Sequence, residues 1–270
     1  MLEHPTLDKL ASLKLTGMLE AIQEQRQMDA YAELSFEERL GMLVDREETV
    51  RKNRLIAGRM KRAALRHEAS VEDINFRHPR GLDRRLILSL ATCQWIHIRR
   101  NCIITGSTGL GKSYLACALA QKAIREGCSA RYERLSRLLA QLTAARHDGT
   151  HTAKIAALAQ IDLLILDDWG VAPLNDDNRR DLLEIFDDRY DRKSTLITSQ
   201  MPVNTWHAYI ANPTFADAIL DRILHNSHRI ELAGPSIRKD KADAAELQEQ
   251  QEVGNCNVTL QIGGGNASVS

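Results

Sequence analysis

The chain has 270 residues, of which 43% are hydrophobic and 27% are charged, and its formal net charge at pH 7 is zero. This length suits one large domain, or one large and one small domain, and the composition is that of a globular protein. The neutral total excludes any argument from overall charge, so only local clusters of charge can indicate a partner. No apolar run approaches the roughly 20 residues of a membrane span, so no membrane partner is expected.

The N-terminus and the cysteines indicate the compartment. The first ten residues, "MLEHPTLDKL", lack the basic and then apolar segments of a secretion signal. The five cysteines are scattered, odd in number and without a CxxC pair. A disulfide framework or a zinc site is therefore not expected, and a cytoplasmic location is predicted.

Residues 1–70 are predicted to form a small helical domain that contacts DNA or a protein partner. Apolar residues from Leu7 to Ile22 recur near a 3.6-residue period. Ser35 followed by Glu38 is the signature of a capping box, and the helix that it opens is expected to extend to Arg66. Residues 75–85 contain Pro and Gly and are predicted to lead into the second domain.

Residues 71–240 are predicted to form an α/β domain, because short apolar segments alternate with helical ones. The predicted strands are 102–105, 129–133, 162–168, 194–199 and 228–232. This alternation indicates a parallel five-stranded sheet flanked by helices. Residues 131–160 are expected to form a strand, a helix, a turn at Asp148-Gly149 and a second helix. Residues 241–270 end in Gly, Asn and Ser, which is typical of a disordered tail.

A phosphate-binding motif lies between the first of these strands and the helix after it. Gly106, Gly111, Lys112 and Ser113 match GxxxxGK[ST], the P-loop pattern, and the strand–helix context argues against an incidental glycine-rich turn. Backbone N–H groups would cradle the phosphates, Lys112 would reach the β- and γ-phosphates, and Ser113 would bind Mg²⁺. The predicted cofactors are ATP and Mg²⁺. The predicted nucleotide-binding residues are Gly106, Ser107, Thr108, Gly109, Leu110, Gly111, Lys112, Ser113 and Tyr114, the last without an assigned role.

Polar residues follow two other predicted strands. In "LLILDDWG", Asp167 is expected to bind Mg²⁺ and Asp168 to orient or deprotonate the attacking water. In "STLITSQ", Thr198 and Ser199 are candidates for holding that water or sensing the γ-phosphate. The alternative for both pairs is an ordinary polar strand end.

Basic residues gather locally although the total charge is zero. Between Arg46 and Arg66 there are eight basic and two acidic residues, and a second cluster contains Arg77 and Arg80. Such an excess is typical of contacts to phosphate backbones, while a solvated helix face is the alternative. His147 and His151 are interpreted as loop residues and not as metal ligands. The predicted DNA contacts are Arg51, Lys52, Arg54, Arg59, Lys61, Arg62, Arg134 and Arg137.

Four stretches together resemble one family. "TGSTGLGKSYLACALAQKA", "LLILDDWG", "LITSQMPVNTWH" and "DAILDRILHNSHRIEL" are similar to the IstB family of AAA+ ATPases, helpers of insertion-sequence transposition related to DnaC-type helicase loaders. The likeness spans roughly residues 5–240. It implies that Arg222 is an arginine finger reaching a neighbour's γ-phosphate and that Arg238 is a second sensor. It also implies that residues 131–160 match a helical insertion that can face DNA. For Arg222, the alternative is a salt-bridged helix arginine.

The resemblance also implies partners. They are double-stranded DNA, a cognate transposase and further copies of the chain in an oligomer that depends on ATP and DNA. The implied cycle is assembly on target DNA with ATP, recruitment and stimulation of the transposase, and disassembly on hydrolysis. A replicative helicase loader and a nucleotide-gated DNA scaffold with negligible turnover are the alternatives.

Overall fold

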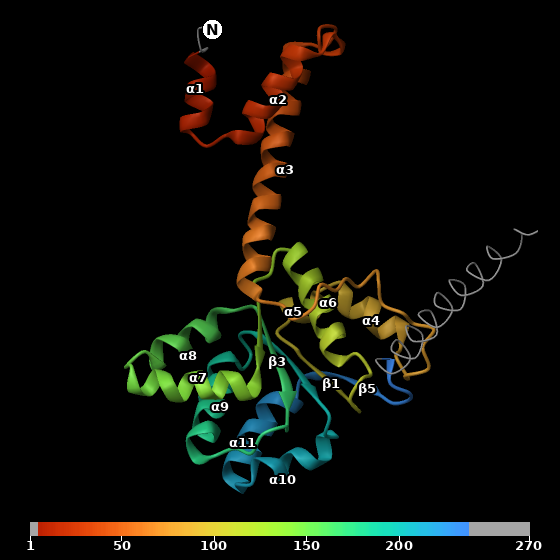
Figure 1. The fold of residues 1–270 in the computed structure, drawn as a ribbon, viewed down its shortest axis with the longest axis vertical. Helices are drawn as coiled ribbons and strands as arrows, with labels where there is room; N and C mark the ends of the chain where they lie inside the picture. The colour runs from red at the N-terminus through yellow and green to blue at the C-terminus, as the bar shows by residue number, and fades with distance from the viewer. Residues whose placement is uncertain (1–4, 238–270) are drawn as a thin grey trace, which may run out of the picture. The chain divides into compact units, whose positions relative to one another are not determined.

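The structure, a computed structural model, describes residues 5–237 of the chain (Figure 1). The chain divides into two compact units, one up to Ala63 and one from Ala64 onward. Arg238 and the predicted tail at 241–270 lie outside the described residues. Within residues 5–237, no helix is both long enough and apolar enough to cross a membrane.

The first unit is helical, as predicted. Its capping box is present, because Ser35 N donates to Glu38 Oε2 at 2.8 Å and Glu38 N donates to Ser35 Oγ at 3.3 Å. The last helix ends at Ala63, short of the expected Arg66, where Ala64 turns the backbone to a φ of +50°. The elements of this unit are α1 (Pro5–Ser12), α2 (Thr16–Gln27), a 3₁₀ turn η1 (Asp29–Tyr31) and α3 (Phe36–Ala63).

Helices α2 and α3 meet at a point that only glycine permits. A Cβ on Gly17 would lie 2.7 Å from Glu47 Cα. The buried Glu47 carboxylate accepts hydrogen bonds from the N–H groups of Gly17 at 2.7 Å and Met18 at 3.2 Å, at the beginning of α2. Arg51 Nε donates to Glu47 Oε1 at 2.6 Å, and this hydrogen bond lowers the pKa of Glu47. Arg51, a predicted DNA contact, therefore also stabilises its own unit.

The second unit contains the predicted parallel sheet. All five expected strands form, and their order in the sheet is β2-β3-β4-β1-β5. The strands are β1 (Asn101–Gly106), β2 (Ala130–Arg134), β3 (Leu163–Trp169), β4 (Ser194–Ser199) and β5 (Ser227–Leu232). The helices are α4 (Arg84–Ala91), α5 (Gln94–His97), α6 (Lys112–Arg125), α7 (Leu135–His147), α8 (His151–Gln160), α9 (Asp176–Arg189), η2 (Val203–Thr205), α10 (Trp206–Ile210) and α11 (Pro213–Leu224).

The helices cover both faces of the sheet (Figure 1). On one face, Ile103, Leu164, Leu166 and Ile197 form a buried core with side chains of α7 to α11. Helix α6 contacts β1, β2, β3 and β4. Strand β3 is buried and begins with a continuous apolar run at 163–166, as is usual in parallel sheets. Polar side chains are then concentrated where the strands end.

The segment after β2 forms the two predicted helices, joined by a turn. Helices α7 and α8 are joined at Asp148-Gly149, and Gly149 has a φ of +69°. His147 is the last residue of α7, and His151 is the first residue of α8. The expectation that both histidines lie in the loop is therefore wrong, because the turn is only three residues long.

Candidate nucleotide site

The loop between β1 and α6 is built on close approaches of its backbone. Gly106, Gly109 and Gly111 all have positive φ angles, of 143°, 84° and 84°. A Cβ on Gly106 would lie 2.4 Å from the carbonyl oxygen of Leu232, and one on Gly111 would lie 2.7 Å from a guanidinium nitrogen of Arg80. Glycine is therefore required for the curl of the loop. The curl ends where α6 begins, so the N–H groups at the N-terminus of α6 face the loop.

Lys112 and Ser113 open helix α6 and face the interior of the loop. Lys112 Nζ donates to the carbonyl oxygens of Gly106 at 2.7 Å and Ser107 at 2.9 Å. The Ser113 hydroxyl lies 2.9 Å from both carboxylate oxygens of Asp167. An ammonium group enclosed by a loop of backbone groups fits a phosphate chain, because it supplies positive charge beside several N–H donors.

Arg80 supports this loop from outside and was not predicted to do so. Its side chain is buried, and its NH1 donates to the carbonyl oxygen of Leu110 at 2.7 Å. Burial lowers the pKa of this guanidinium. Its assignment to a basic cluster on the surface is therefore wrong. The contact joins residues 30 positions apart, and no motif spacing announces it.

The two aspartates at the end of β3 differ in their surroundings. The register between β3 and β4 shifts between Leu166 and Trp169, and Asp168 adopts a left-handed φ of +63°. Aspartate tolerates this conformation better than most residues. The shift separates the two carboxylates, since the Asp167 side chain is fully buried whereas 28% of the Asp168 side chain is exposed.

Asp167 is the centre of a hydrogen-bond network. It accepts from the hydroxyls of Ser113, Thr198 and Tyr132, and Arg66 NH1 lies 3.5 Å from its Oδ2. Burial and the hydrogen bond to Asp167 both raise the pKa of Tyr132, so the phenol stays protonated and donates. A carboxylate beside a serine hydroxyl provides the oxygen ligands that Mg²⁺ prefers. Asp167 and Ser113 therefore fit a magnesium ion.

The two polar residues at the end of β4 are directed to different partners. Thr198 Oγ1 donates to Asp167 and accepts from the N–H of Asp168 at 3.3 Å. Ser199 Oγ donates to the carbonyl oxygen of Trp169 at 2.9 Å and accepts from Met201 N at 3.0 Å. Thr198 therefore lies at the two aspartates, whereas Ser199 stabilises the end of the strand through hydrogen bonds to the backbone.

Asp168 has a cationic partner on the neighbouring strand. Arg134, at the end of β2, places its Nε 3.2 Å from Asp168 Oδ2. The sequence predicted Arg134 only as a DNA contact. It predicted no contact of Arg66 or Tyr132 with Asp167. Their position depends on β2 lying next to β3, and the order of strands in a sheet is not encoded in local sequence patterns.

A basic pocket of about 600 Å³ adjoins these carboxylates. Arg66, Arg131, Arg134 and Arg137 line it, with Glu133 as the acidic residue among its lining. The two predicted DNA contacts of this segment, Arg134 and Arg137, are thus brought together. The other predicted DNA contacts, Arg51, Lys52, Arg54, Arg59, Lys61 and Arg62, lie along α3 in the first unit.

Arg222 lies at the opposite edge of the sheet from the P-loop. Its backbone carbonyl accepts from Asn101 Nδ2 at 3.1 Å, where β1 begins, whereas the P-loop follows the last residue of β1. Its guanidinium donates to Asp187 of α9 and to the carbonyl oxygen of Ala218. Asn101 and Gly106 bound a six-residue strand, which separates the two ends by roughly 17 Å.

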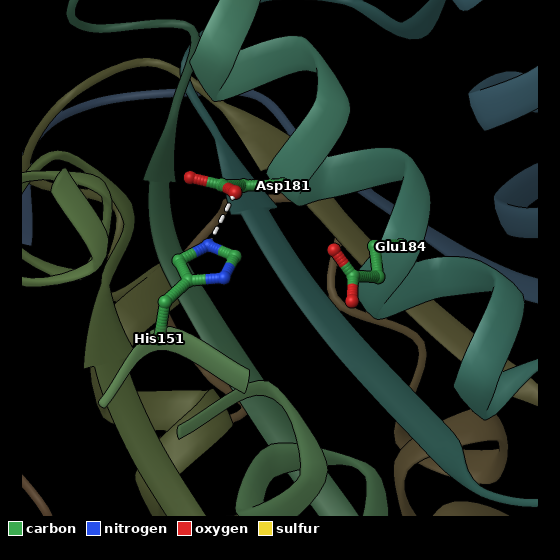
Figure 2. Close-up of side chains that lie close together, drawn as sticks. All are labelled: His151, Asp181 and Glu184. Carbon is green, nitrogen blue, oxygen red and sulfur yellow. Dashed lines mark hydrogen bonds and ion pairs between the residues drawn. The ribbon is translucent and has the colours of Figure 1, made fainter. Parts of the chain in front are cut away.

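A second polar cluster joins α7, α8 and α9. Figure 2 shows His151 directed at Asp181, with Glu184 on the same helix as Asp181. The ligand atoms of these three residues lie within 4.8 Å of one another. However, Asp181 Oδ1 is already paired with Arg146 as well as with His151 Nε2 at 2.8 Å. A guanidinium supplies the positive charge that a metal ion would otherwise provide, so the cluster is interpreted as a buried ionic junction.

Solved structures of other proteins have a fold similar to that of this chain. DnaI matches with a TM-score of 0.54 and 21% identity, over 61% of this chain and 91% of that chain. AMPPCP-bound DnaA from Aquifex aeolicus matches with a TM-score of 0.52 and 19% identity, over 67% of this chain and 56% of that chain. The second unit therefore has the fold of an AAA+ P-loop ATPase core.

Sequence comparison extends the likeness to nearly the whole chain. The insertion sequence ATP-binding protein y4pL of Sinorhizobium fredii is 51% identical, over 89% of this chain and 98% of its own length. The ATP-binding protein of insertion sequence IS1162 from Pseudomonas fluorescens is 45% identical, over 79% of this chain and 93% of its own length. The ATP-binding protein of insertion sequence IS21 from Pseudomonas aeruginosa is 30% identical, over 88% of this chain and 90% of its own length. Residues 8–245 match the model of the IstB-like ATP binding proteins, and the chain belongs to that family.

Proposed function

We propose that this chain is an ATP-dependent DNA-binding helper of insertion-sequence transposition. It assembles on double-stranded target DNA with ATP, recruits and stimulates the transposase of its element, and disassembles when ATP is hydrolysed. The observation that carries the proposal is the convergence of Lys112, Ser113, Asp167 and Asp168 at one edge of the sheet, in a chain whose relatives are named for insertion sequences. The proposed compartment is the cytoplasm.

Each polar group of the site has a role in hydrolysis. Lys112 neutralises the β- and γ-phosphates. Ser113 and Asp167 would hold Mg²⁺, and the ion would supply positive charge to the phosphate oxygens. Asp168 accepts a proton from water while the water oxygen bonds to the γ-phosphorus. The bond between that phosphorus and the bridging oxygen of ADP breaks, and ADP and inorganic phosphate leave. Thr198, hydrogen-bonded to the Asp167 side chain and to the backbone of Asp168, holds the two aspartates in position relative to each other.

The oligomer supplies a further charge to the site. Arg222 cannot serve the P-loop of its own chain, because β1 separates them by roughly 17 Å. A neighbouring copy that docks this edge against the P-loop edge would bring Arg222 to the γ-phosphate, where an arginine stabilises the transition state. The exposed basic residues of α3 and of the β2–α7 segment would contact the DNA backbone.

Replacing Lys112 by Ala tests the proposal. Nucleotide binding should be lost, because the positive charge facing the β- and γ-phosphates is removed, and assembly on duplex DNA should be lost with it. Calorimetry with ATP and a gel-shift assay with duplex DNA measure the two effects. Lys122→Ala is the matched control, since Lys122 lies on the same helix in an exposed pair with Glu126. Wild-type ATP affinity in Lys112→Ala would refute the assignment of the site.

A further inference from the structure

Arg222, the proposed finger, is held in place by three elements of the second unit. Its Nε donates to Asp187 Oδ1 of α9, and its NH1 donates to the carbonyl oxygen of Ala218, one turn earlier on α11. Asn101 Nδ2, at the beginning of β1, donates to the carbonyl oxygens of Arg222 at 3.1 Å and Ile223 at 3.3 Å. The backbone and the side chain of this arginine are therefore both fixed, although 29% of the side chain is exposed.

The two helices that carry Arg222 and Asp187 are anchored in the same hydrophobic core. Phe186 precedes Asp187 on α9, Ile223 follows Arg222 on α11, and both apolar side chains are buried in that core. A contact between side chains that project from packed helices has little freedom to change its geometry. Asp187 itself is half-exposed, so the pair lies at the surface of the second unit, where a neighbouring copy can reach it.

The carboxylate of Asp187 does not cancel the positive charge of this edge. A small recess beside it has four basic residues and one acidic residue among its lining, which are Arg99, Arg189, Lys193, Arg222 and Asp191. Within residues 5–237, the buried Arg189 donates to three backbone carbonyl oxygens and to the Thr195 hydroxyl, and to no carboxylate. A phosphate of a neighbouring copy would therefore still meet an excess of positive charge beside Arg222.

The hydrogen bonds of Arg222 restrict the direction of its remaining donors. Asp187 and Ala218 occupy Nε and NH1, and NH2 has no hydrogen-bond partner within residues 5–237. The guanidinium is planar, so fixing two of its nitrogens also fixes the direction of the third. An arginine that reaches across an interface loses rotamers, and a side chain that is already ordered reduces this cost. Asp187 therefore orients NH2 of Arg222 before a neighbour docks.

We propose that Asp187 is a positioning residue for ATP hydrolysis in the neighbouring subunit, because it holds Arg222 in the orientation in which NH2 meets the γ-phosphate bound to that neighbour. Asp187 touches neither the nucleotide nor the attacking water, and it acts only through Arg222. The inference rests on the proposed function, because it assumes that Arg222 serves the P-loop of another copy. It adds the residue that orients the finger.

The first test measures ATP turnover of the full chain with duplex DNA. Asp187→Ala should lower kcat about tenfold through misplacement of Arg222, and it should leave the KM for ATP unchanged because the nucleotide pocket is intact. The loss is smaller than the roughly 10³- to 10⁵-fold effect of an arginine finger, since Ala218 still holds NH1. Asp187→Asn keeps an oxygen acceptor for Nε, so its kcat should stay within about threefold of the wild type. Asp177→Ala is the control, because it removes an exposed pair with Arg180 from the same helix and should keep the wild-type kcat.

A mixing experiment separates a role in the neighbour from a role within the subunit. Asp168→Asn subunits should bind ATP and hydrolyse it poorly, and they keep both Arg222 and Asp187. Added to Asp187→Ala subunits, they offer correctly held fingers to intact pockets, so turnover per Asp187→Ala subunit should rise toward the wild-type value. The Asp168→Asn, Asp187→Ala double variant is the control and should give no rise. A merely structural defect in α9 stays within its own subunit and is not repaired by a neighbour.

Arg222→Ala mixed with Asp168→Asn subunits is the reference that distinguishes the two proposals. If this reference mixture recovers no turnover, Arg222 does not act in a neighbour, and that part of the proposed function fails together with this inference. If the reference recovers turnover, two results overturn only the role of Asp187. One is an Asp187→Ala kcat equal to or above that of the wild type, and the other is a lowered kcat that Asp168→Asn subunits do not restore. A lowered kcat that these subunits restore supports the role of Asp187.

Discussion

At the scale of single residues, the site depends on two neighbouring aspartates held in different environments. Asp167 is buried among three hydroxyl donors, whereas Asp168 adopts a left-handed backbone conformation and remains partly exposed. The register shift at the end of β3 produces this difference, because it interrupts the regular alternation of side chains along the strand between Leu166 and Trp169. One carboxylate can then hold a cation while the other accepts a proton.

Asp168→Asn should separate nucleotide binding from hydrolysis. The amide keeps the size of the side chain but loses its charge and basicity, so ATP should still bind through Lys112, Ser113 and Asp167. Turnover should fall by roughly 10²- to 10⁴-fold, the effect of removing a general base. Phosphate release and filter binding to duplex DNA measure the two properties. DNA complexes of this variant that decay in ATP as fast as those of the wild type would show that hydrolysis is not the release step.

Arg80 provides a second test at this scale. Its buried guanidinium donates to the carbonyl oxygen of Leu110, so Arg80→Ala removes a support of the P-loop and leaves that carbonyl without its partner. We expect ATP affinity to fall by about tenfold, as for loss of one charge-assisted hydrogen bond. Calorimetry measures it, and a thermal melt verifies the fold. Arg77→Ala is the control, because Arg77 is exposed. Equal ATP affinities in the two folded variants would contradict the role of Arg80.

At the scale of elements, an ionic junction fastens the α7–α8 hairpin to α9. Asp181 is fully buried on α9 and is paired with Arg146 at the end of α7 and with His151 at the beginning of α8. Its Oδ2 has no hydrogen-bond partner among residues 5–237. The hairpin also supplies Arg137 to the basic pocket, so the junction positions an element of the proposed DNA site.

Asp181→Ala should therefore destabilise the fold. Removal of the carboxylate leaves Arg146 and His151 without their anion, and we expect the free energy of unfolding to fall by about 2 kcal/mol, less than for a fully buried pair because both partners are partly exposed. Urea denaturation measures the change. Asp177→Ala on the same helix removes only an exposed pair with Arg180 and should cost at most about 0.5 kcal/mol. Equal midpoints for the two variants would contradict a structural junction.

The helices and strands were largely predictable from the sequence, but the order of the strands in the sheet was not. Apolar runs such as "CIIT" and "LLIL" mark buried strands, and glycines followed by Lys112 and Ser113 mark the loop and helix between them. The contacts of Tyr132, Arg66 and Arg134 with the carboxylates arise only because β2 lies beside β3. Sheet order is a tertiary property, so local patterns assigned Arg134 to DNA alone and left its contact with Asp168 unseen.

At the scale of the whole molecule, the net charge is zero, but charged side chains gather at particular ends of the sheet. The nucleotide site and the basic pocket lie at the carboxyl ends of the strands, whereas Arg222 lies at the end where β1 begins. Within one monomer, the P-loop and Arg222, the proposed finger, therefore lie at opposite ends of β1 and cannot meet. A head-to-tail contact between copies would join these two edges and leave the same two edges free for the next copy, which is the geometry of rings and filaments.

Mixing two inactive variants tests this arrangement. Lys112→Ala subunits keep Arg222 but lack a working pocket, whereas Arg222→Ala subunits keep the pocket but lack the finger. Arg222→Ala should bind ATP and hydrolyse it poorly, and the mixture should recover DNA-stimulated turnover at interfaces where one variant offers Arg222 to the other's pocket. Arg222→Ala mixed with the Lys112→Ala, Arg222→Ala double variant is the control, since pockets are present there without any finger. If the first mixture recovers no turnover while a native gel shows co-assembly, Arg222 acts only through its ion pair with Asp187, within its own chain.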